Sequence, residues 1–167
     1  TGFMNAGAFE NSLMKLDTAY FYNYTPKKQI YLAYKEAKMN VPLNQQYLEI
    51  GGDLGLRGYP SHYQSGDHFQ TLTLEHRFFG AREWFSLAYA GFAVFYDVGH
   101  IWGETAVPQG PSGLHQDIGF GLRLSNTRLG GREGGGHNIL HFDVATPLND
   151  DESLDKMQFL VSVRRSF

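Results

Sequence analysis

The stretch QDIGFGLRLSN, residues 116–126, alternates between two kinds of side chain with a period of two. Its even positions are apolar: Ile118, Phe120, Leu122 and Leu124. Its odd positions are small or charged: Asp117, Gly119, Gly121, Arg123 and Ser125. Because successive side chains of a β-strand point to opposite faces, this pattern predicts a strand with one apolar and one polar face.

The same alternation extends to the rest of the chain and predicts eight strands in an all-β, antiparallel fold. They cover roughly residues 2–11, 15–25, 28–39, 69–79, 84–102, 116–126, 137–146 and 157–167. The segment 28–39 has a composition compatible with a helix, but Tyr31 and Tyr34 interrupt any apolar stripe, so we interpret it as a strand. Most of these segments exceed the usual globular strand of about 5–6 residues and match the roughly 9–11 residues of a strand that crosses a membrane.

The charged residues of these predicted strands lie on one side. They are Glu75, Arg77, Asp97, Asp117, Arg123, Asp143 and Arg164. A soluble barrel would bury the apolar side and expose the charged one, whereas in lipid the apolar side faces outward. The sequence pattern therefore leaves two architectures, a transmembrane β-barrel and a soluble, lipocalin-like β-barrel that carries an apolar ligand. Strand length and the even strand number favour the transmembrane barrel.

Composition narrows the remaining possibilities. The chain has 167 residues, which we interpret as a single domain, residues 1–167. Its net charge of −3 provides no basic field for nucleic acid. The absence of cysteine excludes disulfides and thiol catalysis.

The connections are of two lengths. Short turns are predicted at YTPKK, residues 24–28, and at GARE, residues 80–83, while the loops 41–66, 103–115 and 128–136 are long. Outer-membrane barrels keep long loops on the outside and short turns on the inside, and only the glycine-rich loop 128–136 departs from that arrangement.

The longest of these loops, 41–66, carries the stretch GGDLGLRGYP with Arg57 at its centre. An arginine removed from water needs a carboxylate partner, preferably a bidentate one. The candidates on the polar side of the strands are Asp97, Glu75, Asp117 and Asp143. Asp97 is favoured because Gly99, two residues further on the same face, leaves space for a loop against the strand.

Four motifs and the last residue carry a family resemblance. LRGYP (56–60), LEHRFF (74–79), FYDVG (95–99) and IGFGLRLSN (118–126) resemble, in order and spacing, the barrel motifs of the Omp85 superfamily of outer-membrane proteins. Phe167 resembles that family's C-terminal targeting signal. The resemblance covers about residues 50–167.

The resemblance implies a structural role for each motif. Loop 41–66 would fold back into the barrel, where Arg57, Gly58 and Tyr59 would lock against Asp97 and Gly99. Glu75, Arg77, Asp117 and Arg123 would form a polar network on the inner wall.

The resemblance also implies a function. The protein would sit in the bacterial outer membrane, contact membrane lipid, and insert or translocate proteins or handle lipid, without catalysis and without a cofactor. Phe167 would direct its terminal strand to the outer-membrane assembly machinery.

Two departures from the family pattern leave the size of the barrel open. The 167 residues contain no POTRA-like domain, and the family's barrels typically have sixteen strands where eight are predicted here. The interior of an eight-stranded barrel is just filled by its own side chains. The chain is therefore half of a longer barrel (the anchor or a fragment of a larger translocator), one of two copies in a homodimer that makes a wider barrel, or a short barrel with loop 41–66 over its mouth. We favour the last.

Other functional sites are weakly supported. His62 with His68, and His137 with His141, lack a third ligand for a metal. Ser112, His115 and Asp117 lie near one another in sequence but without a nucleophile-elbow motif. The sequence therefore predicts no metal site and no catalytic residues.

Overall fold

The computed structural model describes residues 12–40, 47–84, 88–103, 113–126, 138–149 and 154–165. These residues form an all-β fold of one large antiparallel sheet and one small hairpin. The large sheet contains β1 (Ser12–Thr25), β2 (Lys28–Asn40), β5 (His68–Trp84), β6 (Ala88–Trp102), β7 (Leu114–Asn126), β8 (Asn138–Pro147) and β9 (Gln158–Arg165). The hairpin consists of β3 (Leu48–Ile50) and β4 (Gln64–Gly66).

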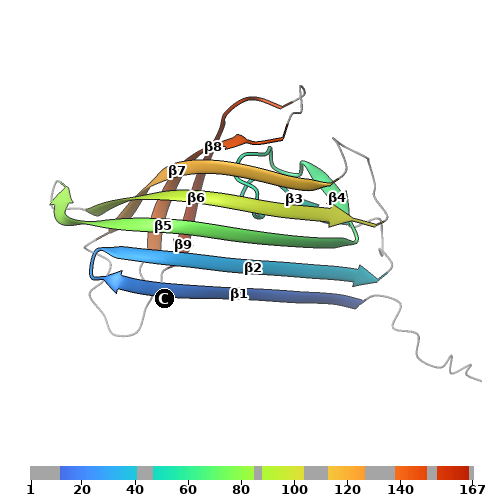
Figure 1. Cartoon of the computed structure of the whole chain (residues 1–167), viewed down its shortest axis with the longest axis horizontal. Helices are drawn as coiled ribbons and strands as arrows, with labels where there is room; N and C mark the ends of the chain where they lie inside the picture. The colour runs from blue at the N-terminus through green and yellow to red at the C-terminus, as the bar shows by residue number, and fades with distance from the viewer. Residues whose placement is uncertain are drawn as a thin grey trace, which may run out of the picture.

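The seven strands of the large sheet follow sequence order, β1-β2-β5-β6-β7-β8-β9, and every neighbouring pair is antiparallel. In Figure 1, β1, β2, β5, β6 and β7 run side by side, while β9 crosses behind them at a steep angle. The sheet is therefore strongly twisted and curved, as antiparallel sheets of this size are. Within the described ranges no pairing joins β1 to β9, so the sheet is not closed into a barrel. Among the same residues, no helix is long and apolar enough to cross a membrane.

Most of the predicted strands are confirmed. The two strands expected over 15–25 and 28–39 are β1 and β2, joined by the predicted tight turn after Thr25. The four strands expected over 69–79, 116–126, 137–146 and 157–167 correspond to β5, β7, β8 and β9. The expected strand 2–11 lies outside the described residues, as do positions 103–115 and 128–136 in large part.

The predicted turn at GARE, residues 80–83, is wrong. β5 continues through these residues to Trp84 and pairs with β6, with a register shift between Phe79 and Glu83. The glycine here allows close backbone approach rather than a reversal, since a Cβ on Gly80 would lie 2.3 Å from the carbonyl oxygen of Ala90. As a result β6 begins at Ala88 rather than at residue 84.

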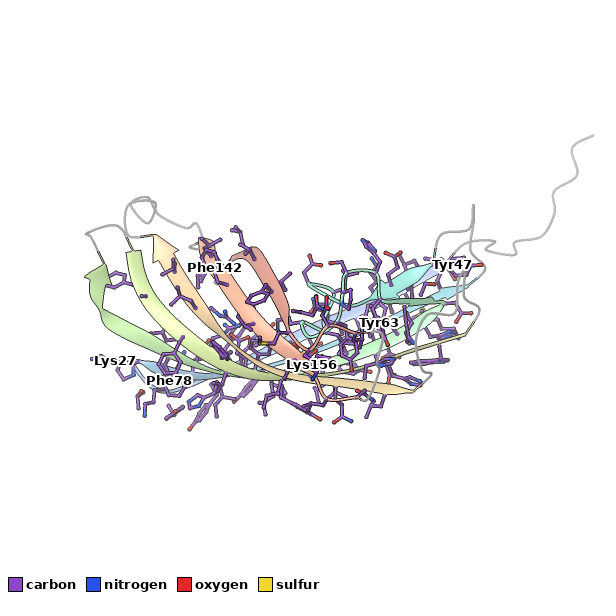
Figure 2. All side chains as sticks on the ribbon, turned by 90° about the horizontal axis from the view of Figure 1, so that it is seen from above. Lys27, Tyr47, Tyr63, Phe78, Phe142 and Lys156 are labelled. Atoms are coloured by element: carbon purple, nitrogen blue, oxygen red, sulfur yellow. The ribbon has the colours of Figure 1, made fainter. Side chains whose placement is uncertain are left out.

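The two faces of the sheet differ in an unusual way. One face exposes large apolar side chains, such as Phe92 (53% exposed) and Phe120 (62%). The opposite face carries charged side chains that are buried, with Glu75 and Asp97 at 0%. Figure 2 shows Tyr63, from the loop that contains β3 and β4, on the concave side of the sheet and Phe78 on the convex side. The apolar core of the molecule is a small cluster between this loop and the sheet, made of Ile50, Leu56, Tyr59, Tyr63 and Ile101.

Candidate functional site

The loop 47–66 lies against the charged face of the sheet. Gly58 approaches β7 so closely that a Cβ on it would be 2.5 Å from the Cβ of Asp117. Gly99 on β6 leaves the space filled by the loop, because a Cβ there would be 2.7 Å from Cδ1 of Ile50 and 3.1 Å from Cδ1 of Leu56. Glycines in the loop and in the wall let it pack flush against the sheet. Because the described strands do not close into a barrel, the position of the loop relative to a barrel mouth stays a prediction.

The side chain of Arg57 extends from this loop into the middle of the charged face, where the residue is 2% exposed. Its Nε donates to Oδ2 of Asp97 at 2.7 Å and its Nη2 donates to Oδ1 of the same residue at 3.0 Å. This is a bidentate, charge-assisted pair, the strongest geometry for an arginine and a carboxylate. The structure thus brings together the two residues that the sequence paired.

The third nitrogen of Arg57 binds two further carboxylates. Nη1 donates to Oε2 of Glu75 at 2.9 Å and to Oδ2 of Asp143 at 3.3 Å. The flat side of the guanidinium lies on the ring of Phe95, with Cζ 3.2 Å from the ring centroid. A desolvated guanidinium over an aromatic ring gains a cation–π interaction in addition to its ion pairs. Residues of β5, β6 and β8 therefore hold a single side chain of the loop.

Two more arginines extend the network along the wall. Arg123 on β7 donates from Nη2 to Oε1 of Glu75 at 3.0 Å, and from Nη1 to Oδ1 of Asp143. Arg77 on β5 donates from Nε to the same Oε1 of Glu75 at 2.8 Å, and its Cζ lies 4.1 Å from the centroid of the Tyr31 ring. We call these ion-paired side chains the Arg57 cluster; its members are Arg57, Glu75, Arg77, Asp97, Arg123 and Asp143.

Electrostatics favour the charged form of Arg57 in this position. Burial lowers the pKa of its guanidinium, but the carboxylates of Asp97, Glu75 and Asp143 raise it by more, so the pKa lies above its ordinary value. The buried guanidinium is therefore held in its charged form.

Asp117 is buried beside the Arg57 cluster but is not ion-paired with it. It is 0% exposed and lies directly across from Asp97 in the register of β6 and β7. Its carboxyl interacts with the backbone N–H of Gly58 and with the carboxyl of Asp97. With Asp117 included, four carboxylates face three arginines here. Asp117 and Glu75 are the two carboxylates expected in the polar network, and of these two Glu75 is ion-paired and Asp117 is not.

Tyr59 anchors the loop at a second point. Its hydroxyl donates to Oδ1 of Asn149 at 2.7 Å and accepts from the backbone N–H of Gln116 at 3.2 Å. Its ring lies 5.3 Å from the ring of His115, whose Nε2 is 2.8 Å from Oε1 of Gln64 in β4. The Arg57 cluster and this second anchor together fix both sides of the Gly58 turn.

Sequence reasoning missed several of these partners. Nothing in the alternating pattern distinguished Asn149, which follows β8, or predicted that the Phe95 ring stacks under Arg57. The one available signal for the latter was Gly119, which faces Phe95 in the register and makes space for its ring, since a Cβ there would be 2.4 Å from Cζ of Phe95. Phe167 lies outside the described residues.

The remaining candidates do not form a site. His62 bonds to Glu49, and Nδ1 of His68 lies 2.6 Å from Oδ1 of Asp67. His137 and Ser112 lie outside the described residues. Within the portion described, no three His, Asp or Glu side chains are placed to hold a metal ion.

A loop is held against a wall by one deeply buried arginine, and no nucleophile and base are paired within the Arg57 cluster. Comparisons with family models, with curated proteins and with solved structures give no match to this chain.

Proposed function

We propose that the chain forms a transmembrane β-barrel of Omp85 type in the outer membrane of a Gram-negative bacterium. In this role it would insert or translocate proteins, or handle lipid at its wall, without catalysing a reaction. The loop 47–66 would pack on the inner face of the barrel and stabilise it, and the ion pair between Arg57 and Asp97 would be its main attachment.

One observation carries this proposal. The sheet exposes its apolar face and buries its charged face, the reverse of the arrangement in a water-soluble sheet. The exposed apolar side chains extend over neighbouring strands, from Leu74 on β5 through Phe92 and Phe120 to Phe142 on β8. An exposed apolar surface of this extent marks an interface, and lipid is the partner that suits a whole sheet face.

Strand length supports the same proposal. β1 has 14 residues and β5 has 17, more than the roughly 9–11 that a tilted strand needs to cross the hydrocarbon core. Strands of this length leave their ends outside the membrane core, where polar side chains are tolerated.

A membrane location requires that the edges of β1 and β9 be paired, because unpaired backbone groups in lipid cost several kcal/mol each. Pairing between the two edges, through residues outside the described ranges, gives a short barrel. Pairing with a second copy gives a wider homodimeric barrel, and pairing with further strands makes the chain part of a larger translocator. By the family resemblance, Phe167 would bring the chain to the outer-membrane assembly machinery.

The test is the behaviour of the purified chain in detergent and in buffer. A folded membrane barrel migrates differently on a gel before and after boiling, and it floats with lipid vesicles in a density gradient. The mass of the protein in the detergent complex distinguishes one copy from two. A chain that stays monodisperse in plain buffer and does not float contradicts the proposal and supports the soluble carrier of an apolar ligand.

A further inference from the structure

An apolar groove of about 530 Å³ crosses the exposed face of the sheet, on the side opposite the Arg57 cluster. Its walls are two rows of cross-strand neighbours from β5 to β8. One row is Leu74, Tyr96, Ile118 and Thr146, continued by Met157; the other is His76, Val94, Phe120 and Val144.

The floor of the groove lies between the two rows, at Phe95, Gly119 and Ala145. These residues alternate with the rows, so their side chains point toward the loop face. Phe95 supports the guanidinium of Arg57 on that other face. The floor is therefore backed, on the loop face, by the buried arginine.

The groove presents hydrocarbon almost exclusively. Its three polar side chains are already hydrogen-bonded within the protein: His76 to the hydroxyl of Tyr24, Tyr96 to Gln116, and Thr146 to the carbonyl oxygen of Pro147. In contrast, Val94 (46% exposed) and Ile118 (49%) remain open to the surroundings. A ligand of this groove is thus selected by apolar contact rather than by a polar headgroup.

The dimensions suit one acyl chain. The row from Leu74 to Thr146 spans four strands, or about 14 Å at the usual strand spacing of about 4.8 Å, and Met157 lengthens it by roughly one more spacing. A lipid tail must span one leaflet, about half of the roughly 30 Å hydrocarbon core. The volume also falls within the roughly 300–1,000 Å³ typical of small-molecule sites.

We propose that this groove binds a single acyl chain of a membrane lipid. The inference rests on the proposed membrane location, because the groove opens on the face that lipid would cover. Strands of such barrels tilt about 35–45° from the membrane normal. A tail lying across the strands is therefore held well away from the normal and from parallel packing with its neighbours, which loosens the lipid next to this part of the wall.

The experiment uses the full chain in vesicles that contain a phosphatidylcholine with a photoreactive group at the middle of one tail. After irradiation, crosslinked residues are mapped by mass spectrometry. We expect crosslinks to concentrate on the groove, at Val94, Ile118 and Val144, rather than on the exposed apolar surface around Tyr20 on β1, which pairs with Leu32 on β2. An even spread over the apolar face would overturn the inference.

Two variants test the same point. Val94→Phe and Ile118→Phe narrow the groove and should lower crosslinking there about tenfold, because displacing roughly two methylene contacts weakens binding by about that factor. Leu16→Phe makes the same exchange on β1, where the side chain is 51% exposed, and should leave crosslinking at the groove unchanged. Equal crosslinking in all three variants contradicts a specific groove.

Flotation of the same samples keeps the two proposals separate. If the chain floats but crosslinks evenly, the membrane proposal is supported and the acyl-chain groove is contradicted. If the chain does not float, both proposals are contradicted.

Discussion

The guanidinium of Arg57 lies on the ring of Phe95 while it forms a bidentate pair with Asp97, two residues further along the same strand. One strand therefore supplies both the surface on which the arginine rests and the carboxylate that fixes its orientation. Both contacts are buried, so Arg57 is the charged anchor of the loop, beside the second anchor at Tyr59.

Arg57→Ala and Asp97→Asn should each lower the free energy of unfolding by about 3–5 kcal/mol, since each leaves buried charge without its partner. The double variant should lose much less than the sum, with a coupling of about 1–3 kcal/mol. Denaturant titration of the folded protein in detergent micelles measures all three values. Lys35→Ala with Asp17→Ala is a matched control, because that pair is 3.9 Å apart and exposed, and its effects should add. Strict additivity at Arg57 and Asp97 would show that the two residues act independently.

The consequence of losing Arg57 should be local before it is global. In Arg57→Ala we expect faster hydrogen exchange in β3, β4 and the Gly58 turn, with β6 and β7 still protected, because the strands retain their own ladder of hydrogen bonds. Hydrogen exchange read by mass spectrometry resolves these segments. Uniform loss of protection in the loop and the strands would mean that the arginine holds the whole sheet.

Asp117→Asn should behave differently from Asp97→Asn, although the two carboxylates face each other across β6 and β7. Asp117 forms no ion pair in the Arg57 cluster, and its carboxyl interacts with the backbone N–H of Gly58 and with the carboxyl of Asp97. An amide of the same shape keeps an oxygen for that N–H and an N–H group for Asp97, so we expect a change in unfolding free energy within about 1 kcal/mol. A loss as large as that of Asp97→Asn would show that the carboxyl of Asp117 is itself required to hold the loop.

Gly99→Ala should weaken the packing of the loop, because the new Cβ would lie 2.7 Å from Cδ1 of Ile50. Overpacking of this kind typically costs about 1–3 kcal/mol. Ile50→Val removes the clashing methyl group, so the double variant should recover part of the loss; thermal unfolding of the three variants measures it. If Ile50→Val recovers none of the loss, the contact between the new Cβ and Ile50 is not the cause of the destabilisation.

Tyr59→Phe removes the hydroxyl that bonds to Asn149 and Gln116, and it keeps the ring against Tyr63 and His115. We expect a loss of about 0.5–1.5 kcal/mol, because the hydrogen bonds of the hydroxyl are lost while the backbone N–H of Gln116 and Oδ1 of Asn149 keep the bond between them. The same denaturant titration measures this, and Tyr22→Phe on the exposed strand β1 is the control. An equal effect of both changes would deny Tyr59 a role as the second anchor.

The strands and the pairing of Arg57 with Asp97 could be predicted because both depend on local pattern or on a simple charge requirement. The alternation in 116–126 fixes which side chains of β7 face the loop, and one arginine in a glycine loop needs a carboxylate. Closure of the sheet could not be predicted in this way, since it depends on the edges of β1 and β9, and alternation says nothing about what pairs with an edge. The error at 80–83 has another cause: a glycine can mark either a turn or a register shift within a strand pair, and here it accompanies a register shift.

The sequence also does not predict that Arg57 and Arg123 share the carboxylates of Glu75 and Asp143. Four carboxylates on one face were equally good partners on chemical grounds, and only the curvature of the sheet decides which of them converge. Asp117 was grouped with the others because it has the same position in the alternation, yet its neighbour in the structure is the backbone of the Gly58 turn.

The large sequence separation between Arg57 and its partners has a consequence for the order in which the chain folds. Its three carboxylate partners lie 18, 40 and 86 residues away in sequence, at Glu75, Asp97 and Asp143. Contacts so distant form slowly, because the intervening chain must first be ordered. All three carboxylates surround the arginine only after β8 has joined the sheet, so full packing of Arg57 reports that β8 is in place. A folding intermediate that lacks β8 would keep the loop in water, where a protease could distinguish an unfinished molecule from a finished one.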